Sequence, residues 1–347
     1  MKIANVTIDE NSPCFIIAEL SANHNGSLTT ALETVRAAKR AGADCIKLQT
    51  YTADTLTINS DKEDFLIRSG SIWDGKNYYQ LYKEAFTPWE WHAEIMNIAE
   101  EEGLICFSSP FDPTSVDFLE KLNVPAYKIA SFEITDIPLI EYVASKGKPV
   151  IISTGIATLE DIELAIDACK RMGNEQIALL KCTSSYPAPI EEANISMIKD
   201  FTERFGIIAG LSDHTIGSTV PVVGTCFGAK IIEKHFILDR SVGGPDASFS
   251  MNEQEFTEMV KAVREAEKAI GKVDYKLTEK QHSGKNFSRS LYVVRDIKAG
   301  EMLTKENVRS IRPGFGLHPK FYPKILNKKV NQDIEKGTRL DLSMILS

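Results

Sequence analysis

Short apolar runs recur along most of the chain, and each is followed by a cluster of polar residues. The eight runs occupy residues 15–18, 45–48, 105–107, 127–129, 150–152, 177–180, 207–209 and 231–232. Continuously apolar runs of this length are typical of parallel strands that are covered on both faces. The pattern therefore predicts eight buried parallel strands.

Amphipathic helical patterns separate these runs. Residues 28–41, 159–172 and 252–270 carry apolar side chains at spacings of three and four, the period of a helix with one buried face. Alternating strands and helices predict a parallel α/β fold, and eight repeats predict a closed (β/α)8 TIM barrel. A doubly wound open sheet is the alternative, but no glycine-rich dinucleotide-binding sequence follows the first run.

The pattern changes after Gly271, where polar residues are followed by short alternating runs with glycine turns. We expect a barrel domain over residues 1–275, a linker over 276–286 and a small mixed domain over 287–347, which needs docking for full stability. Two connections interrupt the repeat. Residues 52 to about 88 are long for a strand-to-helix connection and are expected to form part of a lid, and residues 243–246 form a turn-rich loop.

Composition narrows the class of protein. The hydrophobic share of 43% and the charged share of 25% are ordinary for a soluble globular protein. A net charge of −8 provides no basic field for nucleic acid or an anionic membrane. The six cysteines lack C-x-x-C spacing, and no signal-peptide core or membrane-length apolar stretch is present. We therefore expect a soluble, cytoplasmic protein that holds any anionic ligand with a local cluster of cations.

Polar residues stand at the ends of all eight predicted strands, and in a barrel these ends form the rim where active sites lie. Lys47, Lys128 and Lys234 come from three different strands, so they converge only if the barrel closes. Four serines lie near the same strand ends, namely Ser109, Ser131, Ser153 and Ser212. Ammonium and hydroxyl groups suit a phosphate and a carboxylate on one small ligand. Alternatively, each lysine pairs with a neighbouring acid, although burying Lys47 and Lys128 in apolar strands favours a bound anion.

Two histidines follow the last two runs, His214 in residues 210–215 and His235 in residues 233–235. Taken alone, each is more readily explained as a structural histidine whose hydrogen bonds are satisfied, but at the ends of neighbouring strands the two could hold one divalent metal. With few thiolates nearby, Mn²⁺, Mg²⁺ or Co²⁺ suits the pair as well as Zn²⁺ does. Glu19 and Glu133 end the first and fourth strands and are candidates for a general base or for sugar contacts. Both could instead pair with the lysines.

These motifs resemble the sialic acid synthase family, enzymes that condense phosphoenolpyruvate with an acylamino sugar. The matching stretches are residues 17–26, 47–50, 127–131, 153–155, 182–187, 210–215, 233–236, 244–246 and 312–314. The resemblance covers both domains, and the C-terminal one resembles the antifreeze-like SAF domain of these enzymes. It implies a TIM barrel, a divalent metal and a domain-swapped homodimer.

The resemblance also implies roles for individual residues. His214 and His235 match metal ligands, and Glu19 matches an active-site carboxylate. Positions around phosphoenolpyruvate are matched by Lys47, Ser109, Lys128, Ser131, Ser153, Ser184 and Ser212. Sugar contacts are matched by Gln49, Glu133, Tyr186, Asp246 and Phe287, and Arg312 matches an arginine delivered by the second subunit. Many members of the family have Asn at the position of Ser184 and Thr at the position of Ser109. These two differences affect the geometry with which the site would bind an anion.

Within the family, the chain resembles the pseudaminic acid branch in residues 59–65, 181–184 and 312–322. The sugar of that branch, 2,4-diacetamido-2,4,6-trideoxy-altropyranose, has a methyl where N-acetylmannosamine has a hydroxymethyl. Phe315, Leu317 and Phe321, beside Arg312, would suit this less polar sugar, or they could be the core of the small domain.

The reaction expected from the resemblance joins C3 of phosphoenolpyruvate to the aldehyde carbon of the open-chain sugar, which the metal polarises. Water then adds at C2, and phosphate leaves by C–O cleavage. Alternatives are a sialic or legionaminic acid synthase, a Schiff-base aldolase that uses Lys128 or Lys181, and a non-enzymatic carbohydrate- or ice-binding protein.

Overall fold

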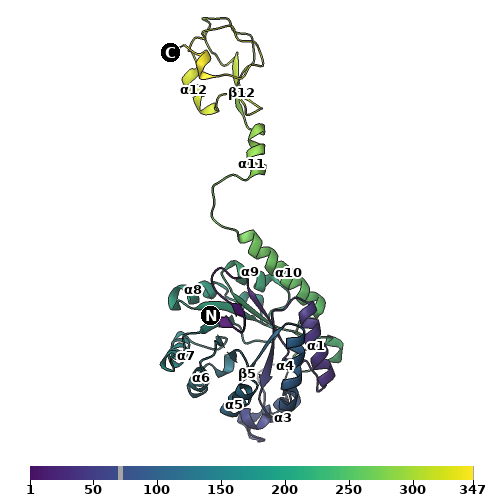
Figure 1. Ribbon diagram of the computed structural model, residues 1–347. Helices are drawn as coiled ribbons and strands as arrows, with labels where there is room; N and C mark the ends of the chain where they lie inside the picture. Colours follow the sequence, from purple (N-terminus) through teal and green to yellow (C-terminus); the bar gives the residue numbers. More distant parts are fainter. Residues whose placement is uncertain (69–72, 347) are drawn as a thin grey trace. The chain divides into compact units, whose positions relative to one another are not determined.

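The computed structural model describes residues 1–68 and 73–346, which form two compact units, Met1–Gly271 and Lys272–Ser347. In the first unit, eight parallel strands close into a barrel in the order β10-β3-β4-β5-β6-β7-β8-β9, and helices surround it (Figure 1). The strands are β3 (Phe15–Glu19), β4 (Cys45–Thr50), β5 (Ile105–Pro110), β6 (Tyr127–Ile129), β7 (Val150–Ser153), β8 (Ile177–Cys182), β9 (Ile208–Asp213) and β10 (Ile231–His235). The predicted TIM barrel is confirmed.

The helices of this unit are α1 (Leu28–Arg40), α2 (Ala53–Leu56), α3 (Tyr78–Ala85), α4 (His92–Glu101), α5 (Pro113–Lys121), α6 (Ile137–Ala144), α7 (Leu159–Arg171), α8 (Ser196–Phe205), α9 (Thr219–Cys226) and α10 (Glu253–Ile270). The three helices expected from periodicity, α1, α7 and α10, begin where polar side chains cap them. Ser27 accepts a hydrogen bond from the backbone of Thr30, and Thr158 and Asn252 form capping boxes.

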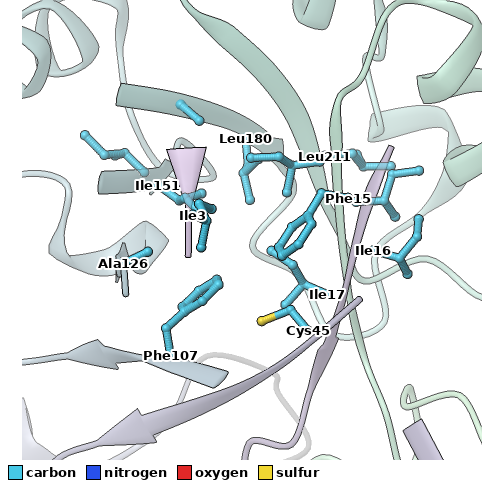
Figure 2. Packing of buried hydrophobic residues seen from close by; sticks show 14 of the residues in the cluster. Ile3, Phe15, Ile16, Ile17, Cys45, Phe107, Ala126, Ile151, Leu180 and Leu211 are labelled. Atoms are coloured by element: carbon cyan, nitrogen blue, oxygen red, sulfur yellow. The ribbon is translucent and has the colours of Figure 1, made fainter. Parts of the chain in front are cut away.

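The register between neighbouring strands shows which residues face the barrel interior. Along a strand, residues two apart lie on the same face, and residues paired across two strands also lie on the same face. The partners are Glu19 with Lys47, Lys128 with Ile151, Cys182 with Ser212 and Ser212 with Glu233. These side chains therefore share the inner face of the barrel, and Glu19, Cys182, Ser212 and Glu233 lie toward the carboxyl ends of their strands. Below them the interior is apolar, and Figure 2 shows Phe107, Ala126, Ile151 and Leu180 packed around Ile3.

An N-terminal hairpin supplies Ile3. Strands β1 (Lys2–Ile3) and β2 (Val6–Thr7) pair antiparallel, and both Ile3 and Ile8 are fully buried in the barrel core. This arrangement closes the interior on the side of the strand N-termini, which leaves the carboxyl ends as the place for chemistry.

The long connection after β4 contains α2, a 3-10 turn (Glu63–Phe65) and α3, with a β-bridge between Leu66 and Asn77. The Nε1–H of Trp73 donates to the carbonyl oxygen of Pro245 at 3.1 Å, so this connection contacts the loop after β10. Residues 69–72, part of the segment that we expected to form a lid, lie outside the described residues.

The second unit contains a two-stranded antiparallel sheet of β11 (Ser290–Val293) and β12 (Val308–Ile311) and the short helices α11 (Glu279–Gly284) and α12 (Tyr322–Ile325). Helix α11 lies within the stretch expected to be a linker. Leu317 and Phe321 pack against the core of this unit, whereas Phe315 is exposed. Two of the three side chains that we considered for sugar binding therefore contribute to the packing of this unit.

All six cysteines are free thiols, and every one except Cys226 is buried. Among the residues that the structure describes, no helix combines the length and the apolar character needed to cross a membrane.

Candidate active site

Two lysines and two glutamates share the buried interior at the carboxyl ends of the strands. Lys47 forms an ion pair with Glu19, and its Nζ lies 3.5 Å from Oε1 of Glu233. The same Oε1 lies 3.9 Å from Nζ of Lys128. Each of these four side chains is at most 7% exposed. One carboxylate, Glu233, thus stands between two ammonium groups.

Three of the predicted serines surround this group. Nζ of Lys128 donates to Oγ of Ser153 at 2.6 Å, and Nζ of Lys47 donates to Oγ of Ser109 at 3.3 Å. The hydroxyl of Ser212 donates to Oε1 of Glu233 at 3.1 Å. Barrel closure therefore brings side chains from β4, β5, β6, β7, β9 and β10 together, as the strand-end pattern predicted.

Lys234 does not join this cluster, and our expectation of three converging lysines was wrong. Its lateral partner is Asp213, and Nζ donates to Oδ2 of Asp213 at 2.5 Å and to the carbonyl oxygen of Thr215. The physical reason is strand alternation: Glu233 and His235 face inward, so the residue between them faces the helices. Lys181 lies on that outer side as well, next to the inward-facing Cys182.

The ion pairs of the two inward lysines contradict our inference from the sequence that their buried charges need a bound anion. We expected a bound anion because an unpaired buried charge is costly, but Glu19 and Glu233 already pair with Lys47 and Lys128. Charge balance alone therefore does not require an anion. The hydroxyls that converge on the lysines are the feature that charge balance leaves unexplained.

The pKa values of the two neighbouring carboxyl groups, Glu19 and Glu233, shift in opposite directions. Burial would raise the pKa of Glu233, but the charges of Lys128 and Lys47 outweigh burial and hold that pKa below its ordinary value. Burial raises the pKa of Glu19 to about 7 despite the opposing charge of Lys47, and the charge of Glu233 adds to the rise. Two nearby acids whose pKa values move apart suit different proton-transfer roles.

Ser131 and Ser184 converge above Gly155. The backbone N–H of Gly155 donates to Oγ of Ser131 at 3.1 Å. A Cβ on Gly155 would lie only 2.0 Å from Oγ of Ser184 and 2.7 Å from Oγ of Ser131. Glycine is thus required for the two hydroxyls to approach each other at the end of β7.

His214 and His235 lie side by side, with their ring centroids 5.3 Å apart. Tyr186 lies 4.3 Å from the ring of His214, and Phe249 lies 5.0 Å from the ring of His235. Nδ1–H of His214 donates to the carbonyl of Thr183 at 2.9 Å, which leaves Nε2 as a lone-pair donor. Nδ1 of His235 is buried and has no hydrogen-bond partner among the described residues.

This geometry fits a metal held by two imidazoles. An oriented ring with a free Nε2 and a neighbouring buried nitrogen without a partner are what metal ligands require. Within residues 1–68 and 73–346, no group of three or more His, Cys, Asp or Glu side chains is arranged around one metal position. Other ligands of such a metal would have to come from water or substrate.

The predicted sugar contacts fall into two places. Gln49 and Asp246 both hydrogen-bond to the hydroxyl of Ser21 after β3, whereas the buried Oε2 of Glu133 has no hydrogen-bond partner among the described residues. Burial raises the pKa of Glu133 to about 7. Phe287 and Arg312 belong to the second unit and are exposed there.

Sequence reasoning missed several residues of the site. Glu233 bridges the lysines, Cys182 lies 3.8 Å from Nδ1 of His214, and Phe249 packs against both histidines. Counting back two positions from His235 would have found Glu233. Nothing in the sequence distinguishes Phe249, which lies in an irregular loop.

Comparisons with known proteins agree with this geometry. A model of the NeuB family matches residues 34–275, and a model of the SAF domain matches residues 288–346. The chain is 50% identical to a pseudaminic acid synthase of Campylobacter jejuni, covering 98% of both chains. It is 47% identical to a pseudaminic acid synthase of Helicobacter pylori, covering 94% of this chain and 96% of the relative.

A solved structure of the N-acetylneuraminic acid (sialic acid) synthetase from Leptospira borgpetersenii, in complex with citrate, is also similar. It is 30% identical with a TM-score of 0.72, and the match covers 82% of this chain and 94% of the synthetase. The chain therefore belongs to the NeuB family and carries a SAF domain after its barrel.

Proposed function

We propose that the chain is a pseudaminic acid synthase, a transferase that forms a carbon–carbon bond. It condenses phosphoenolpyruvate with 2,4-diacetamido-2,4,6-trideoxy-altropyranose and water to give pseudaminic acid and phosphate. The observation that carries the proposal is the 50% identity to a pseudaminic acid synthase over 98% of both chains, together with a barrel interior that suits an anionic substrate. The substrate and the buried free thiols are consistent with a location in the cytoplasm.

Phosphoenolpyruvate is the ligand proposed for the lysine cluster. Lys47 and Lys128 supply positive charge, and Ser109, Ser153 and Ser212 supply hydroxyl donors beside it. Ser131 and Ser184 extend the same set across Gly155. A phosphate and a carboxylate on one small molecule would engage several such donors at once.

His214 and His235 are proposed to hold the divalent metal, Mn²⁺, Mg²⁺ or Co²⁺. When bound, it would act as a Lewis acid that polarises the carbonyl of the open-chain sugar. Tyr186 and Phe249 flank the two imidazoles and shield them from bulk water. Gln49, Glu133, Tyr186 and Asp246 are the barrel residues proposed to contact the sugar.

Glu19 is proposed to handle the proton of the attacking water. C3 of phosphoenolpyruvate bonds to C1 of the sugar, water adds at C2, and the C2–O bond breaks so that phosphate leaves. The water loses one proton as it adds at C2 and its second as C2 becomes the ketone, and these two protons end on the C1 oxygen and on the departing phosphate. A carboxylate whose pKa is raised to about 7 accepts the first of them readily at neutral pH. Lys47, the ion-pair partner of Glu19, would hold the resulting carboxyl group in place.

A second copy of the chain is proposed to complete the site as a domain-swapped homodimer. Loops after β6 to β10 expose large apolar side chains around the barrel mouth: Phe132, Ile156, Ile190, Ile216 and Val242. Apolar side chains gathered around a polar site indicate a surface that a partner covers. Arg312 and Phe287 of the second copy are the proposed contributions, in line with the residues that they match in the family.

Supplying the purified enzyme with phosphoenolpyruvate, Mn²⁺ and one amino sugar at a time tests the function directly. We expect phosphate release with the highest kcat/KM for the 2,4-diacetamido-2,4,6-trideoxy sugar, because the relatives that are 47% and 50% identical over nearly the whole chain are pseudaminic acid synthases. Greater efficiency with N-acetylmannosamine or a legionaminic acid precursor would assign another synthase of the family. Borohydride trapping of pyruvate on the protein would instead indicate a Schiff-base aldolase.

Removal of one imidazole tests the metal assignment without relying on turnover. We expect one Mn²⁺ bound per chain in the wild type, and none in His214→Ala or His235→Ala, when metal is measured by elemental analysis after dialysis. His282→Ala changes an exposed histidine of the second unit and serves as the control. Full metal content in His214→Ala, with an unchanged circular dichroism spectrum, would refute the assignment.

The raised pKa of Glu19 predicts a pH profile. Its carboxyl becomes protonated as pH falls through about 7, so the base is lost on the acid side and kcat/KM should decline there. Glu19→Gln should lower kcat about 10²- to 10⁴-fold and abolish the acid limb. Because burial raises the pKa of Glu133 to about 7 as well, Glu133→Gln is the necessary comparison. If the acid limb of the pH profile disappeared in Glu133→Gln but persisted in Glu19→Gln, Glu133 rather than Glu19 would be the base.

A further inference from the structure

The loop that follows β3 is fastened to the loop that follows β10. Nδ2 of Asn23 donates to the carbonyl of Phe236 at 2.9 Å and to Oγ of Ser250 at 2.8 Å. Nδ2 of Asn25 donates to the carbonyl of Val242 at 3.2 Å. These contacts hold one wall of the barrel mouth, beside Gln49 and Asp246.

Ser21 occupies the centre of this wall in an unfavourable backbone conformation. Its φ is +47°, in the left-handed region that disfavours residues with a Cβ. Its hydroxyl is buried and donates to Oδ2 of Asp246 at 2.5 Å, and it accepts from Nε2 of Gln49 at 3.0 Å. The backbone alone would favour glycine here, so the hydroxyl is the feature that a serine adds.

The hydroxyl determines how the amide of Gln49 is oriented. A serine carries one hydrogen-bonding proton, and Ser21 directs it to the carboxylate of Asp246, so toward Gln49 it can only accept. The second acceptor for Nε2 is Oε1 of Glu19, at 3.0 Å. Both amide protons of Gln49 are thereby used within the wall. Within the described part of the chain its Oε1 accepts no hydrogen bond, so this oxygen is available as an acceptor.

We propose that Ser21 is a positioning residue for the sugar subsite, which fixes Gln49 so that the amide oxygen accepts a hydrogen bond from a donor of the substrate. An acetamido N–H or a ring hydroxyl is the matching chemistry. The proposal rests on the proposed function and assigns the sugar, rather than phosphoenolpyruvate, to this wall. Asp246 is held by the same hydroxyl and by the backbone N–H of Ala22 at 3.3 Å.

Replacing Ser21 with glycine separates positioning from folding. Ser21→Gly removes the hydroxyl and relieves the backbone, so the melting temperature should stay the same or rise. We expect KM for the amino sugar to increase about five- to tenfold, the worth of a hydrogen bond, with KM for phosphoenolpyruvate unchanged. Asn123→Gly is the matched control: its φ is +54°, it is exposed, and its kinetics should match the wild type.

A double-mutant cycle with Gln49→Ala shows whether Ser21 acts through Gln49. Ser21→Gly should have little further effect on sugar KM in the Gln49→Ala background, because the oriented group is gone. An unchanged sugar KM in Ser21→Gly, equal increases for both substrates, or fully additive effects in the cycle would overturn the proposal. Failure of the proposed function is a different result: the wild type itself would release no phosphate with any amino sugar.

Discussion

One shared carboxylate, Glu233, makes a charged barrel interior possible. Lys47 and Lys128 are both buried at the carboxyl ends of their strands, and Oε1 of Glu233 lies 3.5 Å and 3.9 Å from their ammonium groups. Removing one partner of a buried ion pair typically costs about 3–5 kcal/mol. Glu233 belongs to β10, the strand that ends in His235. Strand β10 therefore supplies both the carboxylate that neutralises the lysine charges and the candidate metal ligand His235.

The rest of the barrel supports this arrangement by dividing its interior into two parts. The lower part is apolar and is closed by Ile3 from the N-terminal hairpin, as Figure 2 shows. The upper part is polar, and every strand contributes through a residue with the correct alternation. Because the two glutamates differ in their surroundings, one stays ionised beside the lysines while the pKa of Glu19 is raised to about 7. Charge balance and proton transfer are thus assigned to different side chains.

Sequence periodicity predicted the architecture well, because eight apolar runs separated by amphipathic helices leave few alternatives to a barrel. It also brought Ser109, Ser153 and Ser212 to the lysines. It misplaced Lys234 because we ended the last two strands at their apolar residues, whereas β9 and β10 continue through Asp213 and His235. Alternation within those polar ends decides which residues face inward, and it excludes Lys234 while including Glu233.

Other parts of the site depend on contacts that no local pattern encodes. Phe249 and Ser21 act through loops whose conformation follows from hydrogen bonds between distant segments, such as Asn23 with Ser250. In the sequence, Leu317 and Phe321 fit either sugar contacts or the core of the small domain, and in the structure both are partly buried and pack against that core. Their assignment required the tertiary structure.

Equilibrium binding of phosphoenolpyruvate tests most directly whether the inward lysines form its subsite. The comparison is between wild type, Lys128→Met and Lys181→Met, where Lys181 lies on the same barrel but faces the helices and donates to the carbonyl of Cys182 at 2.6 Å. The account predicts that Lys128→Met weakens binding by about 30-fold or more, the cost of losing a buried charged partner, and that Lys181→Met binds like the wild type. Wild-type affinity in Lys128→Met would contradict the account.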